Sequence, residues 1–213
     1  VVYRYGNSSR KILLVHGWSG RGTQMAVLAR HLKDHGWEII SFDAPAHGKA
    51  PGKKSGMHYF IDSIWHLNSL YGPFDAAIGH SLGGMSLLKT VKEGLPLKKL
   101  VIIGTANSIT QITRNFVKNL QLNEAVAKKM KAYFDKKFGE DMDKSSGAVS
   151  AKNVAVPTLI VHDENDVDVD VSSAFEIHEA LPHSKLLITK NLGHRKILGD
   201  PSVINKITTF ITV

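Results

Sequence analysis

The sequence predicts an α/β domain in which a mostly parallel sheet is covered by helices on both faces. Short apolar segments of strand length alternate along most of the chain with longer amphipathic segments of helix length. The short segments are rich in Ile, Leu, Val and Ala and are mostly apolar throughout, as parallel strands covered on both faces should be. A regular alternation of strands and helices favours a parallel sheet with helices on each side.

Six segments are predicted to be strands, namely residues 11–16, 38–43, 74–79, 99–104, 158–162 and 185–189. Five segments have helical spacing, namely residues 23–35, 57–71, 82–92, 172–181 and 201–211. The chain of 213 residues is long enough for one sizeable core and carries no internal repeat. We therefore expect a single domain spanning residues 1–213.

One interval, approximately residues 107–156, interrupts the alternation because it has no strand signal. Two apolar stripes with helical spacing run through it: Ile109, Ile112, Phe116 and Leu120, then Val126, Met130, Tyr133 or Phe134, and Phe138. Ser145-Ser146-Gly147 then loosens the chain before the next strand. The stripes offer more apolar surface than two short helices can bury against each other. We therefore expect a small helical cap whose apolar side faces the strand ends, with Lys128, Lys129, Lys136 and Lys137 in solvent.

The composition excludes several classes of protein. The net charge of +8 comes mostly from scattered lysines, which indicates a basic surface rather than a nucleic-acid site. No apolar run approaches the roughly 18 to 20 residues of a membrane span. The absence of cysteine excludes disulfides and fits the cytoplasm or the periplasm, with the cytoplasm slightly favoured. Because the chain begins with Val1 rather than Met, we expect that residues have been removed from its N-terminus.

A candidate nucleophile lies at Ser81. Gly79-His80-Ser81-Leu82-Gly83 matches G-x-S-x-G, follows a predicted strand and precedes a predicted helix. Glycines on both sides of the serine remove Cβ atoms that would clash in such a sharp turn. The free N–H groups at the start of the helix favour negative charge beside the serine. A turn that merely ends a strand is the alternative interpretation.

A serine hydroxyl needs a base to take its proton. Four histidines follow Ser81 in the chain: His162, His178, His183 and His194. In enzymes with such a serine turn the chain order is serine, acid, histidine. His194 lies after the last predicted strand, in a loop from which it can reach over the serine. We therefore interpret His194 as the general base.

The acid is expected just after the strand at residues 158–162, where five carboxylates occur: Asp163, Glu164, Asp166, Asp168 and Asp170. Its role is to fix the imidazole tautomer and to stabilise the imidazolium, which requires one buried carboxylate. The other four are expected to face water. A solvated acidic loop, with a weak cation site, is the alternative.

The oxyanion requires backbone N–H donors aimed at the developing charge. One donor is expected from Leu82, directly after the nucleophile. The second is expected from Trp18, because Gly17 allows the backbone after the first strong strand to approach closely. A simple turn that ends the strand is again the alternative interpretation of this segment.

Together these segments resemble the α/β-hydrolase family, and the resemblance covers nearly the whole chain. It rests on His16-Gly17-Trp18, Asp43-Ala44-Pro45-Ala46-His47-Gly48 (family pattern D-x-P-G-H-G), Gly79-His80-Ser81-Leu82-Gly83-Gly84, His162-Asp163-Glu164-Asn165-Asp166-Val167-Asp168-Val169 (pattern H-G-x-x-D-x-x-V) and Gly193-His194. The resemblance implies the α/β-hydrolase fold with a small helical cap insertion. It also places the acid at Asp166.

The chain departs from the family pattern at several positions. Ala46 stands where the loop usually has Gly, Ala50 where Ser is frequent, and Asp170 where Pro is frequent. Only about fifteen residues precede His16, whereas the family usually has two antiparallel strands there. We therefore expect that the sheet is reduced or that its first strand is missing from these residues.

The resemblance implies a serine hydrolase that cleaves a carboxylic ester or thioester of small to medium acyl chain, most similar to carboxylesterases (EC 3.1.1). Dehalogenase-like and epoxide-hydrolase-like members carry Asp in place of Ser81, and large lipases usually have a larger cap. An acyltransferase, a lipase or a C–C hydrolase would use the same three residues. A non-catalytic ligand-binding protein on the same fold is the alternative from another class. The cap residues expected to line the acyl site are Phe116, Met130 and Phe134.

No cofactor, metal or nucleic acid is expected, and the only expected partner is the small-molecule ester or thioester substrate. His31 and His35 have the i, i+4 spacing of helix ligands but not the H-E-x-x-H pattern, which favours a surface histidine pair. Residues 17–22 are rich in glycine but lack the Lys-Ser/Thr of a phosphate loop.

Overall fold

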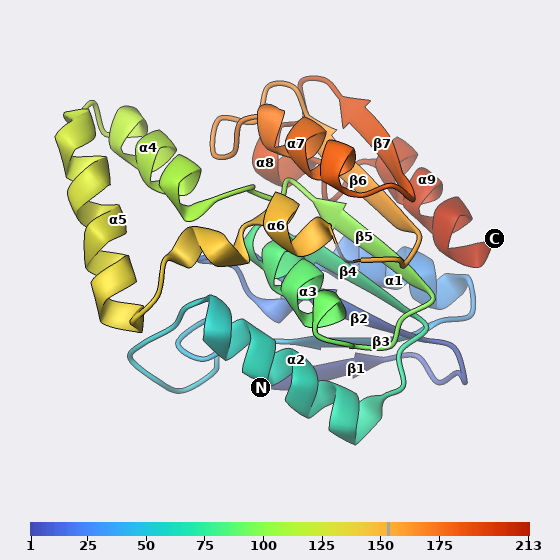
Figure 1. The fold of residues 1–213 in the computed structure, drawn as a ribbon. Coiled ribbons are helices and arrows are strands. Elements are labelled where there is room, and N and C mark those ends of the chain that lie inside the picture. Colours follow the sequence, from blue (N-terminus) through green and yellow to red (C-terminus); the bar gives the residue numbers. More distant parts are fainter. Residues whose placement is uncertain (153) are drawn as a thin grey trace.

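A computed structural model describes residues 1–152 and 154–213 and shows a seven-stranded sheet between two layers of helices (Figure 1). The strands are β1 (Val2–Tyr5), β2 (Lys11–Val15), β3 (Glu38–Phe42), β4 (Ala76–His80), β5 (Lys99–Ile103), β6 (Thr158–Asp163) and β7 (Ser184–Thr189). Their order across the sheet is β1-β3-β2-β4-β5-β6-β7. All neighbouring pairs are parallel except β1 with β3, so the predicted fold class is confirmed.

The edge strand β1 is the one strand that the sequence pattern did not predict. It runs antiparallel to β3, with Val2 opposite Phe42. Its side chains are largely exposed, so it lacks the continuous apolar run of the other strands. Arg4 of β1 donates from Nε to Oε1 of Glu38 at 2.9 Å, and this hydrogen bond holds the pKa of Glu38 below its usual value. Within the described residues, the N-terminal part of the sheet therefore contains one antiparallel strand.

Helices cover both faces of the sheet (Figure 1). The face layers contain α1 (Ala26–Asp34) and α9 (Pro201–Thr212) on one side and α2 (Met57–Tyr71), α3 (Leu82–Lys92), α6 (Gly147–Ala151) and α7 (Ser172–Ala180) on the other. Two 3-10 turns, η1 (Gly22–Met25) and η2 (Met142–Ser145), and one short helix, α8 (Gly193–Lys196), lie in the connections. No helix of the described part of the chain has the length and apolar character needed to cross a bilayer.

Alternate side chains of strands β2 to β7 enter opposite cores. In β2, Leu13 and Val15 pack with residues of α2 and α3, whereas Ile12 and Leu14 pack with residues of α1 and α9. All four side chains are fully buried. Since burial of a Leu, Ile or Val side chain stabilises the fold by about 1.5–3 kcal/mol, this double core fixes the sheet and the positions at which its strands end.

Two helices between β5 and β6 form a hairpin that stands away from the sheet, α4 (Ile109–Asn119) and α5 (Glu124–Phe138) (Figure 1). We call this pair the cap hairpin. Ile109 and Ile112 pack against a small buried cluster at the strand ends. Phe116 and Leu120, in contrast, are 51% and 53% exposed. The expected burial of the first stripe against the strand ends therefore holds for its first turn and is wrong for its second.

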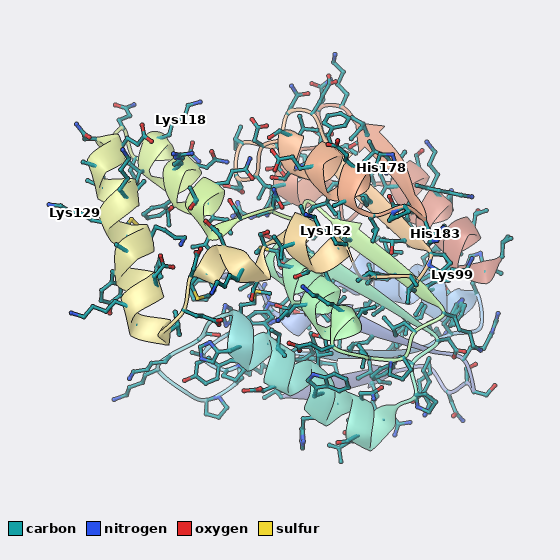
Figure 2. All side chains as sticks on the ribbon, in the orientation of Figure 1. Lys99, Lys118, Lys129, Lys152, His178 and His183 are labelled. Carbon is teal, nitrogen blue, oxygen red and sulfur yellow. The ribbon has the colours of Figure 1, made fainter. Side chains whose placement is uncertain are left out.

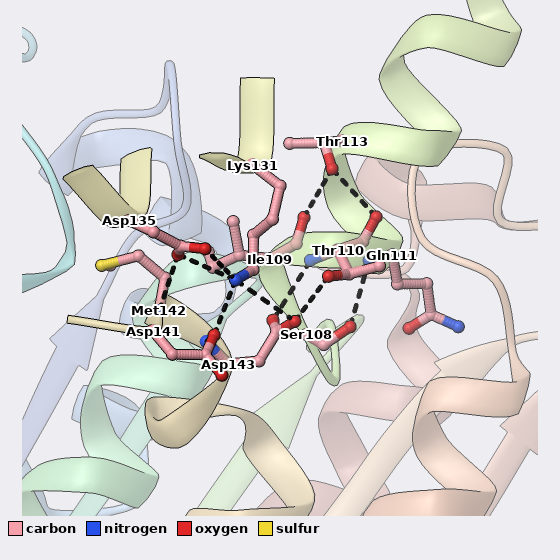
Figure 3. Close-up of polar contacts among 10 residues, drawn as sticks. All are labelled: Ser108, Ile109, Thr110, Gln111, Thr113, Lys131, Asp135, Asp141, Met142 and Asp143. Atoms are coloured by element: carbon pink, nitrogen blue, oxygen red, sulfur yellow. Dashed lines mark hydrogen bonds and ion pairs between the residues drawn. The ribbon is translucent and has the colours of Figure 1, made fainter. Parts of the chain in front are cut away.

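The four lysines expected in solvent are exposed, and Figure 2 shows Lys129 pointing away from the sheet. Lys131 on the same helix differs from them. Its ammonium group binds Oδ2 of Asp135 at 2.7 Å and Oδ1 of Asp141 at 2.6 Å (Figure 3). Asp143 of η2 in turn accepts a hydrogen bond from the Thr110 backbone N–H at 3.1 Å. One half-buried cation and three carboxylates thus join α5, η2 and α4.

The loop after β3 contains the first departure from the family pattern. Asp43 fixes this loop by accepting hydrogen bonds from the backbone N–H of Gly22 at 2.7 Å and of Lys49 at 2.8 Å. Ala46 has a φ of 59°, in the left-handed region that favours glycine. The chain therefore carries a strained alanine where the family pattern has Gly.

Replacing this alanine should relieve the strain. We expect Ala46→Gly to raise the free energy of unfolding by about 0.5–1 kcal/mol, because the left-handed conformation costs an L-residue about 1–2 kcal/mol and the extra freedom of glycine offsets part of the gain. Urea unfolding of the two proteins measures the difference. Ala50→Gly in the same loop is the matched control, and it should not stabilise because Ala50 has no positive φ. A destabilised Ala46→Gly variant would contradict the strain.

Candidate active site

Ser81 lies in a sharp turn between β4 and α3. Its backbone has φ 53° and ψ −119°, a conformation that is rare and costly for a residue with a side chain. Its N–H still continues the sheet by donating to the Ile103 carbonyl at 2.9 Å. A Cβ at Gly79 would lie 2.7 Å from the Gly83 backbone, and one at Gly83 would lie 2.3 Å from the Val15 carbonyl oxygen. Only glycine fits at either position, so the local sequence determines this turn.

The loop after β2 lies directly against the serine. A Cβ at Gly17 would be 2.8 Å from the Cβ of Ser81 and 3.2 Å from the His80 carbonyl oxygen. Trp18 follows this contact in the chain, and Leu82 begins α3 directly after Ser81. Of the two residues expected to bind the oxyanion, Leu82 thus follows Ser81 directly, and Trp18 follows the glycine that lies against it. The Trp18 indole is largely exposed and packs edge-on against His47, with ring centroids 5.2 Å apart.

Asp166 and His194 form the shortest side-chain contact of the site. Nδ1 of His194 lies 2.6 Å from Oδ2 of Asp166, with the Asp166 side chain buried and 9% of the His194 side chain exposed. The other carboxylate oxygen accepts the backbone N–H groups of Asp168 and Val169, both at 2.9 Å. A carboxylate can only accept, so Nδ1 carries the proton and Nε2 is left free to accept one. This is the tautomer that a general base requires.

His194 lies next to the serine turn, although it is not in a loop as expected. It belongs to the one-turn helix α8, which follows β7. Its ring lies 4.5 Å from that of His80, the residue before Ser81, measured between centroids. A Cβ at Gly104 would lie 3.1 Å from His194 Nδ1 and 3.4 Å from Asp166 Oδ2. The hydrogen bonds found within residues 1–152 and 154–213 do not include one between Ser81 Oγ and His194 Nε2. Such contacts often tighten only when substrate is bound.

The acidic segment contains two buried carboxylates rather than the one that we expected. Asp166 is buried, as its assignment requires, but Asp163 is also buried, with 0% exposed. Asp168 is partly exposed and lies 3.7 Å from Arg195, while Glu164 pairs with Lys190 at 2.7 Å. The expectation that all carboxylates other than the acid face water is therefore wrong for Asp163.

Asp163 connects the loop after β6, which carries Asp166, to α8, which carries His194. We call these two segments the acid loop and the base helix. Its Oδ2 accepts from Thr189 Oγ1 at 2.7 Å and from the Leu192 N–H at 3.0 Å, and its Oδ1 accepts from the Asn165 N–H at 3.0 Å. Burial raises the pKa of this carboxyl, but the hydrogen bonds outweigh burial and hold the pKa below its usual value. In the H-G-x-x-D-x-x-V pattern, position 163 is the glycine. An Asp in place of that glycine, at the end of a buried strand, is the sequence signal that could have indicated a buried carboxylate at this position.

Three buried histidines near the strand ends were not assigned roles from the sequence. His16 accepts the Ala44 N–H at its Nε2, at 3.0 Å, and so links the oxyanion loop to the loop after β3. His162 lies 3.0 Å through Nε2 from the Val169 carbonyl and supports the acid loop. His80 contacts His194. Burial is the largest cause of a lowered pKa in each of the three, so they remain neutral at physiological pH.

An apolar cluster adjoins the nucleophile. Its residues are Met57, Met85, Ala106 and Val169, with Ile61, Leu82, Ile109 and Ile112 packed against them. Phe116, Met130 and Phe134, which we expected to line an acyl site, do not belong to it. Phe116 is exposed, and the other two are half-buried on α5. A groove of about 810 Å³ lies between α4 and α5, but Ser81 and His194 do not line it.

Two groups of side chains could be considered for metal binding. Ligand atoms of Asp166, Asp168 and His194 lie within 4.8 Å of one another, but two of these residues already share the Nδ1–Oδ2 hydrogen bond. The rings of His31 and His35 stack with centroids 4.3 Å apart, and His35 Nδ1 bonds to the His31 carbonyl at 2.7 Å. That stacking fits a surface pair better than two ligands of one ion.

The bonds of Asp163 lead to a testable contrast with Asp168. Asp163→Asn should lower the free energy of unfolding by about 1–3 kcal/mol, because an amide N–H₂ would face groups that are themselves donors. Asp168→Asn is the control and should change stability by no more than about 0.5 kcal/mol. Urea unfolding measures both, and an Asp163→Asn protein as stable as the parent would refute the attachment.

The comparisons with known proteins agree with this fold. Residues 12–204 match the profile of the alpha/beta hydrolase family. A monoacylglycerol lipase from Paleococcus ferrophilus is similar in structure, with a TM-score of 0.77 and 17% identity over 99% of this chain and 97% of that one. An esterase from Exiguobacterium antarcticum has a TM-score of 0.77 and 16% identity over 100% of this chain and 95% of that one.

A meta-cleavage product hydrolase from Pseudomonas fluorescens IP01 is also similar, with a TM-score of 0.72 and 16% identity over 99% of this chain and 93% of that one. A search of curated protein sequences finds no match. At these identities the solved structures establish the fold alone. The family profile spans most of the sequence, and this chain therefore belongs to the α/β-hydrolase family.

Proposed function

We propose that this protein is a serine hydrolase that cleaves carboxylic esters or thioesters of small to medium acyl chain through an acyl-enzyme. The observation that carries the proposal is the short hydrogen bond between Asp166 and His194, beside a serine held in a strained turn. The strained backbone of Ser81 lowers the stability of the fold, and the Asp166–His194 pair holds the imidazole in the tautomer of a base. Both features are expected where a nucleophile must project from a fixed position.

In the proposed reaction, His194 Nε2 takes the proton of Ser81 Oγ while that oxygen attacks the substrate carbonyl carbon. The carbonyl oxygen becomes an oxyanion and is bound by the backbone N–H groups of Trp18 and Leu82. His194 then gives its proton to the departing alkoxide or thiolate, which leaves an acyl group on Ser81. Water enters next and loses a proton to His194, and its attack on the acyl carbon releases the carboxylic acid and restores the serine. Asp166 keeps Nδ1 protonated throughout.

We place the acyl chain against the apolar cluster beside Leu82 rather than against the outer part of the cap hairpin. Ile109 and Ile112 bring the first turn of α4 into that cluster, next to the residue that follows the nucleophile. Phe116 lies one turn further along the same helix and is more than half exposed. The short buried stretch of α4 favours a small to medium acyl group.

Other reactions use the same three residues. Acyl transfer to an acceptor other than water, hydrolysis by a lipase and cleavage of a C–C bond differ in substrate and not in the triad. Relatives of similar fold include proteins described as a monoacylglycerol lipase, an esterase and a meta-cleavage product hydrolase. A binding protein without catalysis would not need the Asp166–His194 pair in this tautomer. Ester hydrolysis is the simplest activity that every part of the site serves.

Covalent labelling tests the nucleophile and the acid. A fluorophosphonate probe should attach to Ser81, and Ser81→Ala should abolish the labelling. Asp166→Asn should lower kcat by about 10⁴, as the corresponding change does in a protease triad, because the imidazole then takes the wrong tautomer. Asp168→Asn, at a carboxylate two residues away, should keep nearly full activity. Labelling of another serine, or an active Ser81→Ala protein, would show that Ser81 is not the nucleophile.

A series of p-nitrophenyl esters tests the acyl site. From acetyl to butyryl or hexanoyl esters kcat/KM should climb, since each buried CH₂ contributes about 0.8 kcal/mol, nearly fourfold, and it should then level off. Ile112→Ala should move the optimum to longer chains by opening space in the cluster. Phe116→Ala, on the same helix, is the matched control and should leave the optimum in place.

The opposite result, with the optimum moved by Phe116→Ala and not by Ile112→Ala, would place the acyl chain along the outer part of the cap hairpin, with Phe116, Met130 and Phe134. Activity that keeps rising to palmitoyl esters and increases at a lipid–water interface would identify a lipase. Acyl-CoA thioesters run beside the esters decide between the two leaving groups.

A further inference from the structure

His80 lies between three segments of the proposed catalytic machinery. It is the last residue of β4 and is bonded directly to Ser81, and only 2% of it is exposed. Its Nε2 lies 2.8 Å from the backbone carbonyl oxygen of His194. On its other side, a Cβ at Gly17 would lie 3.1 Å from Nδ1. One imidazole thus contacts the oxyanion loop and the base helix while belonging to the nucleophile turn.

The hydrogen bond fixes the tautomer of His80. A carbonyl oxygen can only accept, so Nε2 must carry the proton, and in a neutral ring Nδ1 then has none. Nδ1 is buried and has no hydrogen-bond partner within the described residues. Protonating it would place a charge where no acceptor can bind it, which burial strongly disfavours. The ring is therefore confined to one tautomer and one charge state.

Its neutrality matters because of what lies beside it. Burial, and then the nearby His194, lower the pKa of His80 to about 3. The two rings are 4.5 Å apart between centroids, and the proposed reaction turns His194 into a cation. A second imidazolium at this distance would oppose that step. A neutral ring fills the space and supplies a donor without adding charge.

We propose that His80 is a positioning residue that sets the approach of the general base to the nucleophile. Its Nε2–H holds the main chain of His194, and its own main chain continues into Ser81. This link, which we call the brace, joins Ser81 to the backbone carbonyl of His194 through the side chain of His80. Asp166 orients the imidazole ring of His194, and His80 fixes the position of the His194 main chain. This inference rests on the proposed function of Ser81 and His194.

Two substitutions separate this role from simple filling of the core. His80→Leu keeps an apolar side chain of moderate size and removes the donor. His80→Gln supplies an amide N–H₂ about as far from Cβ as the imidazole Nε2. His35→Leu is the matched control, because it also removes a bond from a histidine ring to a backbone carbonyl, far from the site. Thermal unfolding of each variant reports any general loss of structure.

The experiment measures kcat and KM on a p-nitrophenyl ester for all three variants. His80→Leu should lower kcat by about 10²-fold with little change in KM, as expected when a reacting group is displaced by about 1 Å. His80→Gln should recover at least about tenfold of that loss, and His35→Leu should match the parent. A His80→Leu protein with unchanged kcat, or a His80→Gln protein no better than His80→Leu at equal stability, would overturn the proposal.

A second readout does not depend on activity. In the parent protein, ¹⁵N NMR of the histidine rings should show His80 in the Nε2–H tautomer from pH 5 to pH 9. The carbonyl ¹³C shift of His194 should change in His80→Leu and remain near the parent value in His80→Gln. An Nδ1–H tautomer, or protonation of His80 above pH 5, refutes the brace even if every ester is hydrolysed. If no ester or thioester is hydrolysed, the proposed function fails, and these shifts still decide whether His80 holds the His194 carbonyl.

Discussion

The parallel pairing of four neighbouring strands is the constraint on which the candidate site depends. In β4, β5, β6 and β7 all carboxyl ends meet at one edge of the sheet, and the register brings His80 opposite Ile103 and Asp163 opposite Thr189. The residues that follow these ends are far apart in the chain. Ser81 follows β4, Asp166 follows β6, and His194 lies just after β7. The sheet therefore decides which loops meet, and the loops need only adjust the approach of the side chains.

Close backbone approach makes the second contribution. The loops lie nearer to one another than any side chain would permit, because a Cβ at Gly17, Gly79 or Gly83 would come within 3.0 Å of a neighbouring atom. A Cβ at Gly84 would lie 2.0 Å from Oγ1 of Thr105. Glycine loses more conformational freedom on folding than other residues, which costs about 0.5–1 kcal/mol at each such position. Apolar burial in the two cores offsets that cost and supports a serine turn that would not be stable alone.

The sequence predicted the parts of this arrangement that depend on local pattern. Buried parallel strands are apolar throughout, so six of the strands were found, and the serine turn was found from its glycines. β1 was missed because an edge strand with exposed side chains carries no such run. Helical spacing predicted α4 but not the exposure of Phe116, because spacing does not show which part of the fold a helix face packs against. Asp163 looked like a solvated carboxylate because its partners, Thr189 and Leu192, are distant in the chain.

Buried apolar and buried polar side chains stabilise different parts of this molecule. The apolar cores fix the strands, whereas buried polar side chains at the strand ends fix the loops. His16 links the loops after β2 and β3, and Asp163 links those after β6 and β7. The cap hairpin has its own polar junction at Lys131, which shares no residue with the loop bonds. The Lys131 junction and the loop bonds at the strand ends therefore involve separate residues, whereas Ile109 and Ile112 of α4 pack in the same cluster as Val169, whose N–H is bound by Asp166. Under the proposed function, substitutions at the Lys131 junction should leave the contacts of Asp166 and His194 in place, and substitutions at Ile109 or Ile112 act closer to the site.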